Sequence, residues 1–523
     1  MADFGSPLET HLNLDLLRRR LIHYPDKGLL SHLLEGVRLE ADVELQAVLV
    51  PHLTSLSKGY ASVEKEVRRL HSLGWYDLFA SFPFWPMYLN GQGATARKLE
   101  PDRFRRTTEG GGPRQPTFDL SGLRALSINE ASHIYHVPQY FERDTRPVFR
   151  EWLMARELIG PKAAARHEAE AAGEAPDDQW QAHTKWPKEV KPQVADLMRD
   201  LAVLRRASEL LNEPLYFFGD DAKDYFNQLA IAAPDLWKLG IVFVASEGDL
   251  DGHSPDDPRL VFVSERRLGF GTHGASNVAQ RFSDALLVLF RESMDEQDIA
   301  ANQLDTRPSM EQWQRHRQEA QEKSGEPCRQ NRRWSEAGYV TSEQARVEVC
   351  AQHRLYQAYM FTDDPLFVVV GVERTIRALR IWRELTNDLN LIMAIPEKRS
   401  LGTWAPWIGI VAVATLGLVL VPKDKLLRAA HAIDRVLTDS EEFGTYRSLI
   451  GLLEHIRQAN LRGRQFMHGL YAPHSSEGAS RHGPSGVVVC DPLMRKQLQR
   501  WRRLLFRSSG VNVKLALDRN EIE

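Results

Sequence analysis

This sequence of 523 residues has few cysteines, and the three it has, Cys328, Cys350 and Cys490, are far apart. That number and spacing exclude a disulfide framework and a finger-type zinc site, and they indicate a reducing compartment. The N-terminus lacks a basic start followed by an apolar run, so we expect no secretory signal and a cytoplasmic or nuclear location. No internal repeat is evident.

A strong net charge is also lacking: the sum is −3 at pH 7, with 43% hydrophobic and 26% charged residues. This composition is that of a globular protein and excludes wholesale disorder. It leaves nucleic-acid partners open, because such enzymes need local, not global, positive charge. The length exceeds that of one ordinary domain and predicts roughly two to four subdomains.

One long apolar run, Leu401 to Val421, carries no charge and has the length of a membrane span. It also contains Pro406 and three glycines, and it divides into two Val- and Ile-rich segments around Ala414 and Thr415. A buried β-hairpin explains these features better than a helix does. We therefore expect no stable membrane association, although an anchored protein stays the alternative.

Acidic residues follow two apolar strands. Tyr216 to Phe218 runs into Gly219 and Asp220, and YMFTDDPLFVVV predicts a hairpin with Asp363 and Asp364 at its turn. A carboxylate at such a place must be solvated, paired or bound to metal. Carboxylates brought together there could hold two Mg²⁺ ions for phosphoryl transfer. Asp is common in turns, so spacing alone leaves ordinary turns as the other interpretation.

Three segments carry a family resemblance. Residues 220–231 (DDAKDYFNQLAI) resemble the first palm motif of retroelement reverse transcriptases, an Asp followed five residues later by Tyr or Phe. Residues 268–287 (LGFGTHGASNVAQRFSDALL) resemble the second, LPFGLxxAPxxFQ, with Gly269 in place of Pro and Ala279 in place of Phe. Residues 361–364 (FTDD) resemble the YxDD hairpin, and Pro365 follows directly.

Further segments match in order. IPEK at 395–398 looks like the later lysine motif, WIGI at 407–410 like the primer grip, and VPKDKLL at 421–427 like the entrance to the thumb. Residues 98–106 resemble the fingers segment that binds the triphosphate. The region after the thumb resembles that of DIRS-type elements, where an RNase-H-like domain would follow; we expect that domain to be absent from this sequence.

The resemblance implies an α+β right-hand polymerase with fingers, an antiparallel-sheet palm and a helical thumb. We expect a helical extension at 1–59, fingers at 60–215, a palm at 216–420 and a thumb or connection at 421–523. Polar, weakly periodic segments near 160–193 and 294–344 are interpreted as insertions.

The resemblance also implies the site residues. Asp220, Asp363 and Asp364 would be catalytic and would bind two Mg²⁺ ions (or Mn²⁺), with Asp221 as a further ligand, or as the main one if the register is shifted by one. Nucleotide contacts are expected from Tyr225, Phe226, Gly271, Gln280, Lys98, Arg103, Arg105, Arg106 and Lys398. Primer or nucleic-acid contacts are expected from Trp407, Ile408, Gly409, Arg495, Lys496, Arg500, Arg502 and Arg503.

Local charge gives independent support. From Phe443 to Arg507 there are eleven Lys or Arg residues against three acidic ones. Such a balance is typical of a surface that follows phosphates, although a solvated helix face is the other interpretation. The sequence thus predicts an RNA-directed DNA polymerase acting on an RNA or DNA template–primer with deoxynucleoside triphosphates. The alternatives are an inactive nucleic-acid-binding retroelement remnant and, less favoured because of the aromatic at 225, a viral RNA-dependent RNA polymerase.

Overall fold

The computed structural model describes residues 9–24, 26–39, 41, 48–81, 83, 87–97, 100–109, 128–131, 191–245, 260–269, 271–272, 274–323, 354–438, 441–471, 487–488, 490–507 and 510–512. The helices are α1 (Leu14–Arg20), α2 (Lys27–Glu35), α3 (Leu56–Ser72), α4 (Ile128–Ala131), α8 (Val194–Leu211), α9 (Ala275–Gln303), α10 (Pro308–Lys323), α13 (Val372–Asp388), α14 (Lys423–Thr438), α15 (Phe443–Gln458) and α17 (Pro492–Arg507).

The strands are β1 (Val48–Leu49), β2 (Tyr76–Phe79), β3 (Tyr88–Leu89), β4 (Gly91–Arg97), β5 (Glu100–Glu109), β6 (Leu215–Gly219), β7 (Gly240–Val244), β8 (Leu260–Glu265), β9 (Tyr356–Phe361), β10 (Asp364–Val370), β11 (Ser400–Gly402), β12 (Trp404–Trp407), β13 (Ile410–Val413), β14 (Leu418–Leu420), β15 (Glu441–Glu442), β16 (Val487–Val488) and β17 (Gly510–Asn512). This mixture of helices and sheets agrees with the predicted α+β class.

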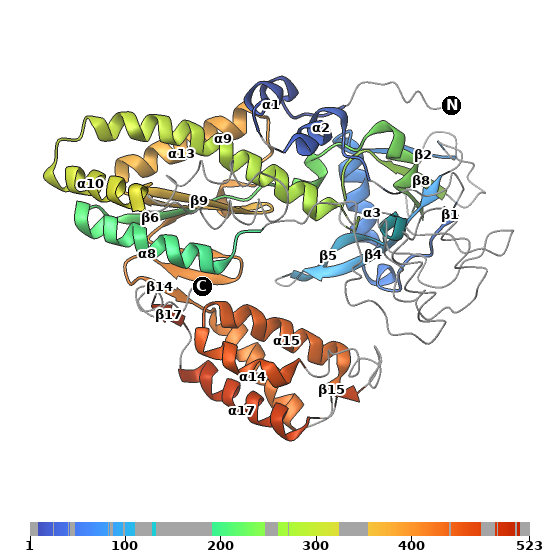
Figure 1. The fold of residues 1–523 in the computed structure, drawn as a ribbon. Coiled ribbons are helices and arrows are strands. Elements are labelled where there is room, and N and C mark those ends of the chain that lie inside the picture. The colour runs from blue at the N-terminus through green and yellow to red at the C-terminus, as the bar shows by residue number, and fades with distance from the viewer. Residues whose placement is uncertain are drawn as a thin grey trace, which may run out of the picture.

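The central layer is an antiparallel sheet of order β11-β6-β10-β9, called the carboxylate sheet below. Its strands are apolar on both faces because both faces are covered. Phe218 and Phe367 stack at 4.2 Å on the face that α9 and α13 cover. Phe217 and Val368 pack on the other face, in the same core as α8. Figure 1 shows α9 and α13 on one side of β6 and β9, with α8 on the opposite side.

Helix α9 extends the predicted helix at 276–290 in both directions. Its predicted apolar face is confirmed, since Ala279, Phe282, Leu286 and Leu289 are all fully buried. The predicted N-terminal extension contributes α1 and α2, and Leu17 and Leu29 join the core that contains α9. A buried ion pair between Asp26 and Arg281 (2.6 Å) ties α2 to α9.

A second sheet, of order β1-β3-β7-β8-β2, packs against α3, and the separate hairpin β4–β5 lies beside the same helix. In Figure 1 this hairpin points from the N-terminal sheet toward the middle of the molecule. The hairpin therefore projects toward the carboxylate sheet from a different part of the chain.

The apolar run 401–421 forms strands, as the hairpin interpretation predicted. β12 pairs with β13, and β13 pairs with β14, antiparallel in both cases. No helix in the described part of the chain is long and apolar enough to cross a membrane. Helices α14, α15 and α17 then pack together through an apolar core that includes Ile433, Leu453 and Trp501, and they form the lower part of Figure 1.

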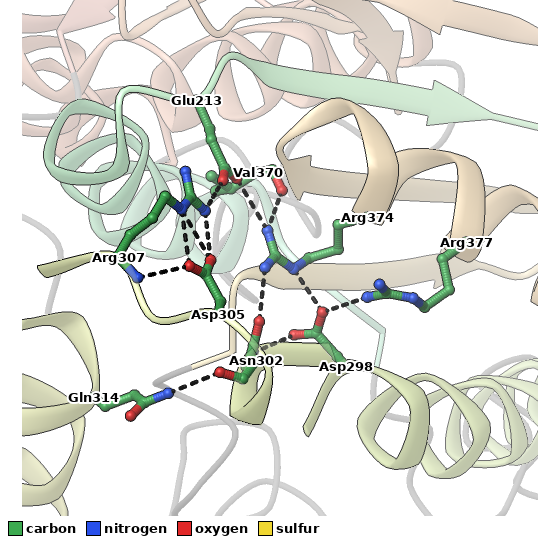
Figure 2. Close-up of polar contacts among 9 residues, drawn as sticks. All are labelled: Glu213, Asp298, Asn302, Asp305, Arg307, Gln314, Val370, Arg374 and Arg377. Carbon is green, nitrogen blue, oxygen red and sulfur yellow. Dashed lines mark hydrogen bonds and ion pairs between the residues drawn. The ribbon is translucent and has the colours of Figure 1, made fainter. Parts of the chain in front are cut away.

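The start of the second predicted insertion differs from the structure. The insertion was predicted to begin near residue 294, but α9 continues to Gln303 and α10 follows at Pro308. Asp298 of α9 lies in a polar network: it accepts from Arg374 at 2.6 Å and from Arg377 at 2.8 Å, and Arg374 also contacts Glu213 at 3.3 Å (Figure 2). The first part of the predicted insertion is therefore helix packed against the rest of the protein, not a solvated loop. The other predicted insertion lies outside the described residues, apart from 191–193.

Candidate functional site

The predicted acidic hairpin is confirmed. β9 and β10 pair antiparallel with Phe361 opposite Asp364, and the turn is made by Thr362 and Asp363. Thr362 has a φ of 58°, a left-handed conformation that a β-branched residue rarely adopts. Pro365 lies opposite Met360 within β10, and its carbonyl accepts from the Asp220 amide at 3.4 Å. This backbone contact joins the two acidic segments.

Side chains of α9 hold the acidic turn in place. The Gln280 amide group donates to the Met360 carbonyl and accepts from the Thr362 amide, both at 3.0 Å. The Ser283 hydroxyl donates to the Thr362 carbonyl. Gln280 is fully buried, so its predicted contact with the nucleotide pocket is not available here. In this structure it instead fixes the turn that presents Asp363.

The two upstream carboxylates point in different directions. Asp220 accepts from the indole N–H of Trp382 at 3.3 Å and from Arg399 at 3.2 Å. Trp382 belongs to α13, so Asp220 lies on the face of the sheet that α9 and α13 cover. Asp221 forms an ion pair with Lys398, and side chains alternate along an extended chain. Asp221, one residue on from the predicted main ligand, therefore lies on the side opposite to α13.

Electrostatics connect Asp221 with the acidic hairpin. Burial raises the pKa of Asp363, with Asp221 adding to the rise and Arg105 and Lys398 opposing it. Burial also raises the pKa of Asp364 to about 7, with Asp363 and Asp221 as further causes. Like charges at close range penalise each other's ionised form. These carboxylates thus form one cluster that a nearby cation would stabilise.

The donor types at this cluster suit Mg²⁺, which prefers carboxylate oxygens. Among the described residues, however, no group of three or more His, Cys, Asp or Glu side chains is already arranged to hold a metal ion. Lys398 and Arg399 pair with Asp221 and Asp220 in this conformation. Metal binding would replace Lys398 as the counter-charge of Asp221.

Two aromatic residues follow the upstream carboxylates. Tyr225 is 1% exposed, and its hydroxyl lies 2.9 Å from the Ser283 hydroxyl. It therefore offers no surface to a sugar in this structure. Phe226 lies five residues after Asp221, the spacing of the reverse-transcriptase motif, and it is 8% exposed. Phe226 is thus a buried residue like Tyr225, and only its spacing from Asp221 is compatible with a register shifted by one residue.

The predicted basic segment divides between surface and core. Arg105 is exposed and influences Asp363, as described above. Arg106 is buried and forms an ion pair with Glu265, which contradicts its predicted contact with a nucleotide. Lys98 and the side chain of Arg103 lie outside the described residues. Lys398, predicted to contact phosphates, is 59% exposed beside Asp221.

The predicted primer-grip turn contacts the acidic hairpin directly. Trp407 is buried and donates its indole N–H to the Asp364 carbonyl at 3.2 Å. The Ile408 backbone amide donates to the Asp364 carboxylate, and this hydrogen bond partly opposes the rise in the pKa of that carboxyl. Ile408 and Gly409 have φ values of 37° and 80° and form the tight turn. Trp407 therefore braces Asp364, and its ring is not presented at the surface.

The basic residues of α17 have different environments. Met494, Leu498 and Trp501 face the apolar core, so the charged residues lie on the remaining faces. Arg502 forms a bidentate ion pair with Asp434, Nε to Oδ1 at 2.8 Å and Nη2 to Oδ2 at 2.9 Å. Arg495 donates to the Leu437 carbonyl, Arg500 lies over the Phe466 ring, and Lys496 and Arg503 are exposed.

Four contacts were missed at the sequence level: Arg399 and Trp382 with Asp220, Ser283 with the turn, and Glu265 with Arg106. Arg399 directly follows Lys398 and could have been suspected from that position. The other three depend on which faces of distant elements meet, which single-sequence spacing does not give.

The sequence matches no protein-family model and no curated protein. Among solved structures it is similar to the foamy viral protease–reverse transcriptase. The dRH form with double-stranded DNA gives a TM-score of 0.45 at 10% identity, over 97% of this chain and 63% of that one. The complex with an RNA/DNA hybrid gives 0.43 at 11% identity, over 97% and 48%, and a complex with double-stranded DNA gives 0.40 at 10%, over 97% and 74%. The chain thus spans less than two thirds of the length of the first two structures.

Proposed function

We propose that this protein is a template-directed DNA polymerase of the reverse-transcriptase class. The observation that carries the proposal is that backbone hydrogen bonds join the two acidic segments. The Asp220 amide donates to the Pro365 carbonyl at 3.4 Å and the Ala222 amide to the Asp363 carbonyl at 3.0 Å, so Asp221 lies beside the β9–β10 turn. The exposed cations Arg105 and Lys398 influence the same cluster. Clustered carboxylates with cations beside them are the arrangement that phosphoryl transfer to a triphosphate requires.

In this proposal the carboxylate sheet is the palm, the β4–β5 hairpin belongs to the fingers, and α14, α15 and α17 form the thumb. Asp221 and Asp363 would hold two Mg²⁺ ions with Asp364 beside them. Bound there, the ions would activate the primer 3′-hydroxyl and neutralise charge on the leaving pyrophosphate.

The remaining residues act on substrates. Lys398 would leave Asp221 when metal binds and pair with the triphosphate, and Arg105 would contact the triphosphate from the hairpin. Phe226 would lie against the sugar and disfavour a 2′-hydroxyl. Lys496 and Arg503 on α17 would contact the phosphates of the template–primer, as exposed cations do in sequence-independent binding. Asp220 would anchor the strand end through Trp382 and Arg399.

Primer extension tests this proposal. Purified protein with a primed RNA template, deoxynucleotides and Mg²⁺ should extend the primer, and Asp363→Asn should abolish extension while still binding the template–primer. Asp434→Asn, a change on the surface of α14, serves as the control. Extension that survives Asp363→Asn, or wild-type protein that binds the template–primer without extending it, would contradict the catalytic proposal.

A second candidate function has one observation in its favour. Asp220 and Asp221 both pair with cationic side chains, and no described carboxylate group is already arranged for a metal. A retroelement-derived protein that binds nucleic acid without polymerising could keep such pairs permanently. Wild-type binding without extension would support this second function.

A further inference from the structure

Adjacent arginines of the β4–β5 hairpin face opposite ways. Side chains alternate along a strand, and in β5 Arg105 is exposed whereas the Arg106 guanidinium is only 8% exposed. Figure 1 shows the β4–β5 hairpin pointing from the N-terminal sheet toward the middle of the molecule, where the carboxylate sheet lies. The contacts that hold the Arg106 side chain therefore set the direction in which the Arg105 side chain extends.

Arg106 is held by a buried polar cluster at the edge of the N-terminal sheet. It pairs with Glu265, whose carboxylate is 2% exposed, and it donates to Gln92 at 3.0 Å and to the Tyr76 hydroxyl. Glu265 and Tyr76 lie opposite each other in the β8–β2 register. A buried charge that loses its partner is strongly destabilising. The cluster therefore fixes the hairpin to one point of the sheet.

A second contact presses the hairpin against the loop that leads to α9. A Cβ at Gly271 would lie 2.0 Å from the Thr108 carbonyl oxygen, and Gly271 has a φ of +110°. The backbones approach so closely that a side chain is excluded. The same loop continues into α9, where Gln280 holds the acidic turn. The hairpin and the acidic turn are thus both attached to one continuous segment, residues 265–280.

We propose that Arg106 and Glu265 are positioning residues whose buried ion pair holds the β4–β5 hairpin so that Arg105 meets the triphosphate of the incoming nucleotide. This inference rests on the proposed polymerase function. Neither residue touches the nucleotide. Loss of the pair should weaken nucleotide binding while leaving the template–primer bound, because the basic helix α17 belongs to a different part of the fold.

The test measures two affinities without turnover. Protein is bound to a template–primer whose primer lacks a 3′-hydroxyl, and the Kd for the matching deoxynucleoside triphosphate is determined beside the Kd for template–primer. Arg106→Gln should raise the nucleotide Kd about tenfold to a hundredfold, the value of a charge-assisted contact. Arg106→Lys should recover part of this loss, and the milder Gln92→Ala should raise the nucleotide Kd about two- to fivefold.

Arg266→Gln is the matched control. Arg266 pairs with Glu9 at 2.8 Å and with Asp77, so this change breaks two ion pairs next to the same sheet without touching the hairpin. It should leave both affinities unchanged. If Arg106→Gln and Gln92→Ala leave the nucleotide Kd unchanged, or raise both Kd values together, the positioning role is overturned while wild-type extension still supports the polymerase. If wild type neither binds nucleotide nor extends, the proposed function fails and the inference fails with it.

Discussion

Trp382 donates its indole N–H to Asp220 Oδ2 at 3.3 Å, and this contact holds the Asp220 carboxylate against α13. The neighbouring Asp221 is then the carboxylate that interacts with Asp363 and Asp364. In the proposed polymerase the upstream motif is therefore shifted by one residue, and Phe226 takes the position five residues after the carboxylate.

Sugar selection should depend on Phe226 and not on Tyr225. Phe226→Ala should increase ribonucleotide incorporation relative to deoxynucleotide by about tenfold to a hundredfold, the range that one pocket contact supplies. Tyr225→Phe removes only the hydroxyl bonded to Ser283 and should leave selectivity unchanged. Single-nucleotide kcat/KM values for both sugars measure this. Unchanged selectivity in Phe226→Ala would contradict the shifted register.

The brace between Gln280 and the acidic turn should be needed for stability and activity. Gln280→Met keeps the size of the side chain but leaves the Thr362 amide and the Met360 carbonyl without their partner. Each unsatisfied buried group costs about 1–3 kcal/mol. For the two groups together, urea denaturation should show a loss of free energy of unfolding of about 2–6 kcal/mol, with reduced extension. Full stability with full extension would mean that Gln280 does not hold the turn.

The free energy of unfolding should depend on pH through Asp364. Its pKa rises from 3.8 to about 7, chiefly through burial. The folded state therefore binds this proton more tightly than the unfolded state does. The resulting stabilisation is complete below pH 3.8 and is lost as the pH rises through about 7. The side chain introduced by Asp364→Asn does not titrate, so this variant lacks that contribution to the pH dependence.

Urea denaturation of both proteins across this range provides the comparison. Between about pH 4 and pH 8, the free energy of unfolding of Asp364→Asn should fall less steeply than that of wild type. Parallel curves would show that Asp364 has an ordinary pKa.

Single substitutions in the polar network of Figure 2 should lower the free energy of unfolding. Arg374→Met removes the buried 2.6 Å contact with Asp298 and the partly buried 3.3 Å contact with Glu213. Breaking a buried pair costs about 3–5 kcal/mol. Arg380→Met, on the exposed side of the same helix, is the matched control and should cost less than about 1 kcal/mol. Equal losses in the two variants would mean that the network contributes nothing specific.

The sequence predicted the elements better than the directions of their side chains. The acidic hairpin, the apolar face of α9 and the paired strands within 401–421 follow from period-2 and period-3.6 patterns, which act locally. Arg106 and Gln280 were assigned to the nucleotide from motif position, but both are buried and bonded within the protein. Which of two adjacent residues faces a distant element depends on sheet register, which the sequence leaves open.

The same limit applies to the Asp220–Asp221 pair. Both carboxylates follow one apolar strand, and an aromatic lies five residues after each. Only the packing of α13 on the sheet, which brings Trp382 to Asp220, distinguishes them. The polar segment near 294–344 was interpreted as an insertion with at most a possible exposed helix. Its ion pairs, Asp298 with Arg374 and Arg307 with Glu213, join residues far apart in the chain, which local spacing does not predict.

The most direct measurement of the central claim is primer extension by wild type, Asp221→Asn and Asp220→Asn, with template–primer affinity measured alongside. Loss of a metal ligand removes several kcal/mol of transition-state stabilisation, so Asp221→Asn should reduce the rate by at least about a hundredfold with unchanged affinity. Asp220→Asn retains an acceptor for Trp382 and should lose less than about tenfold. The reverse order, with Asp220→Asn inactive and Asp221→Asn active, would contradict the account.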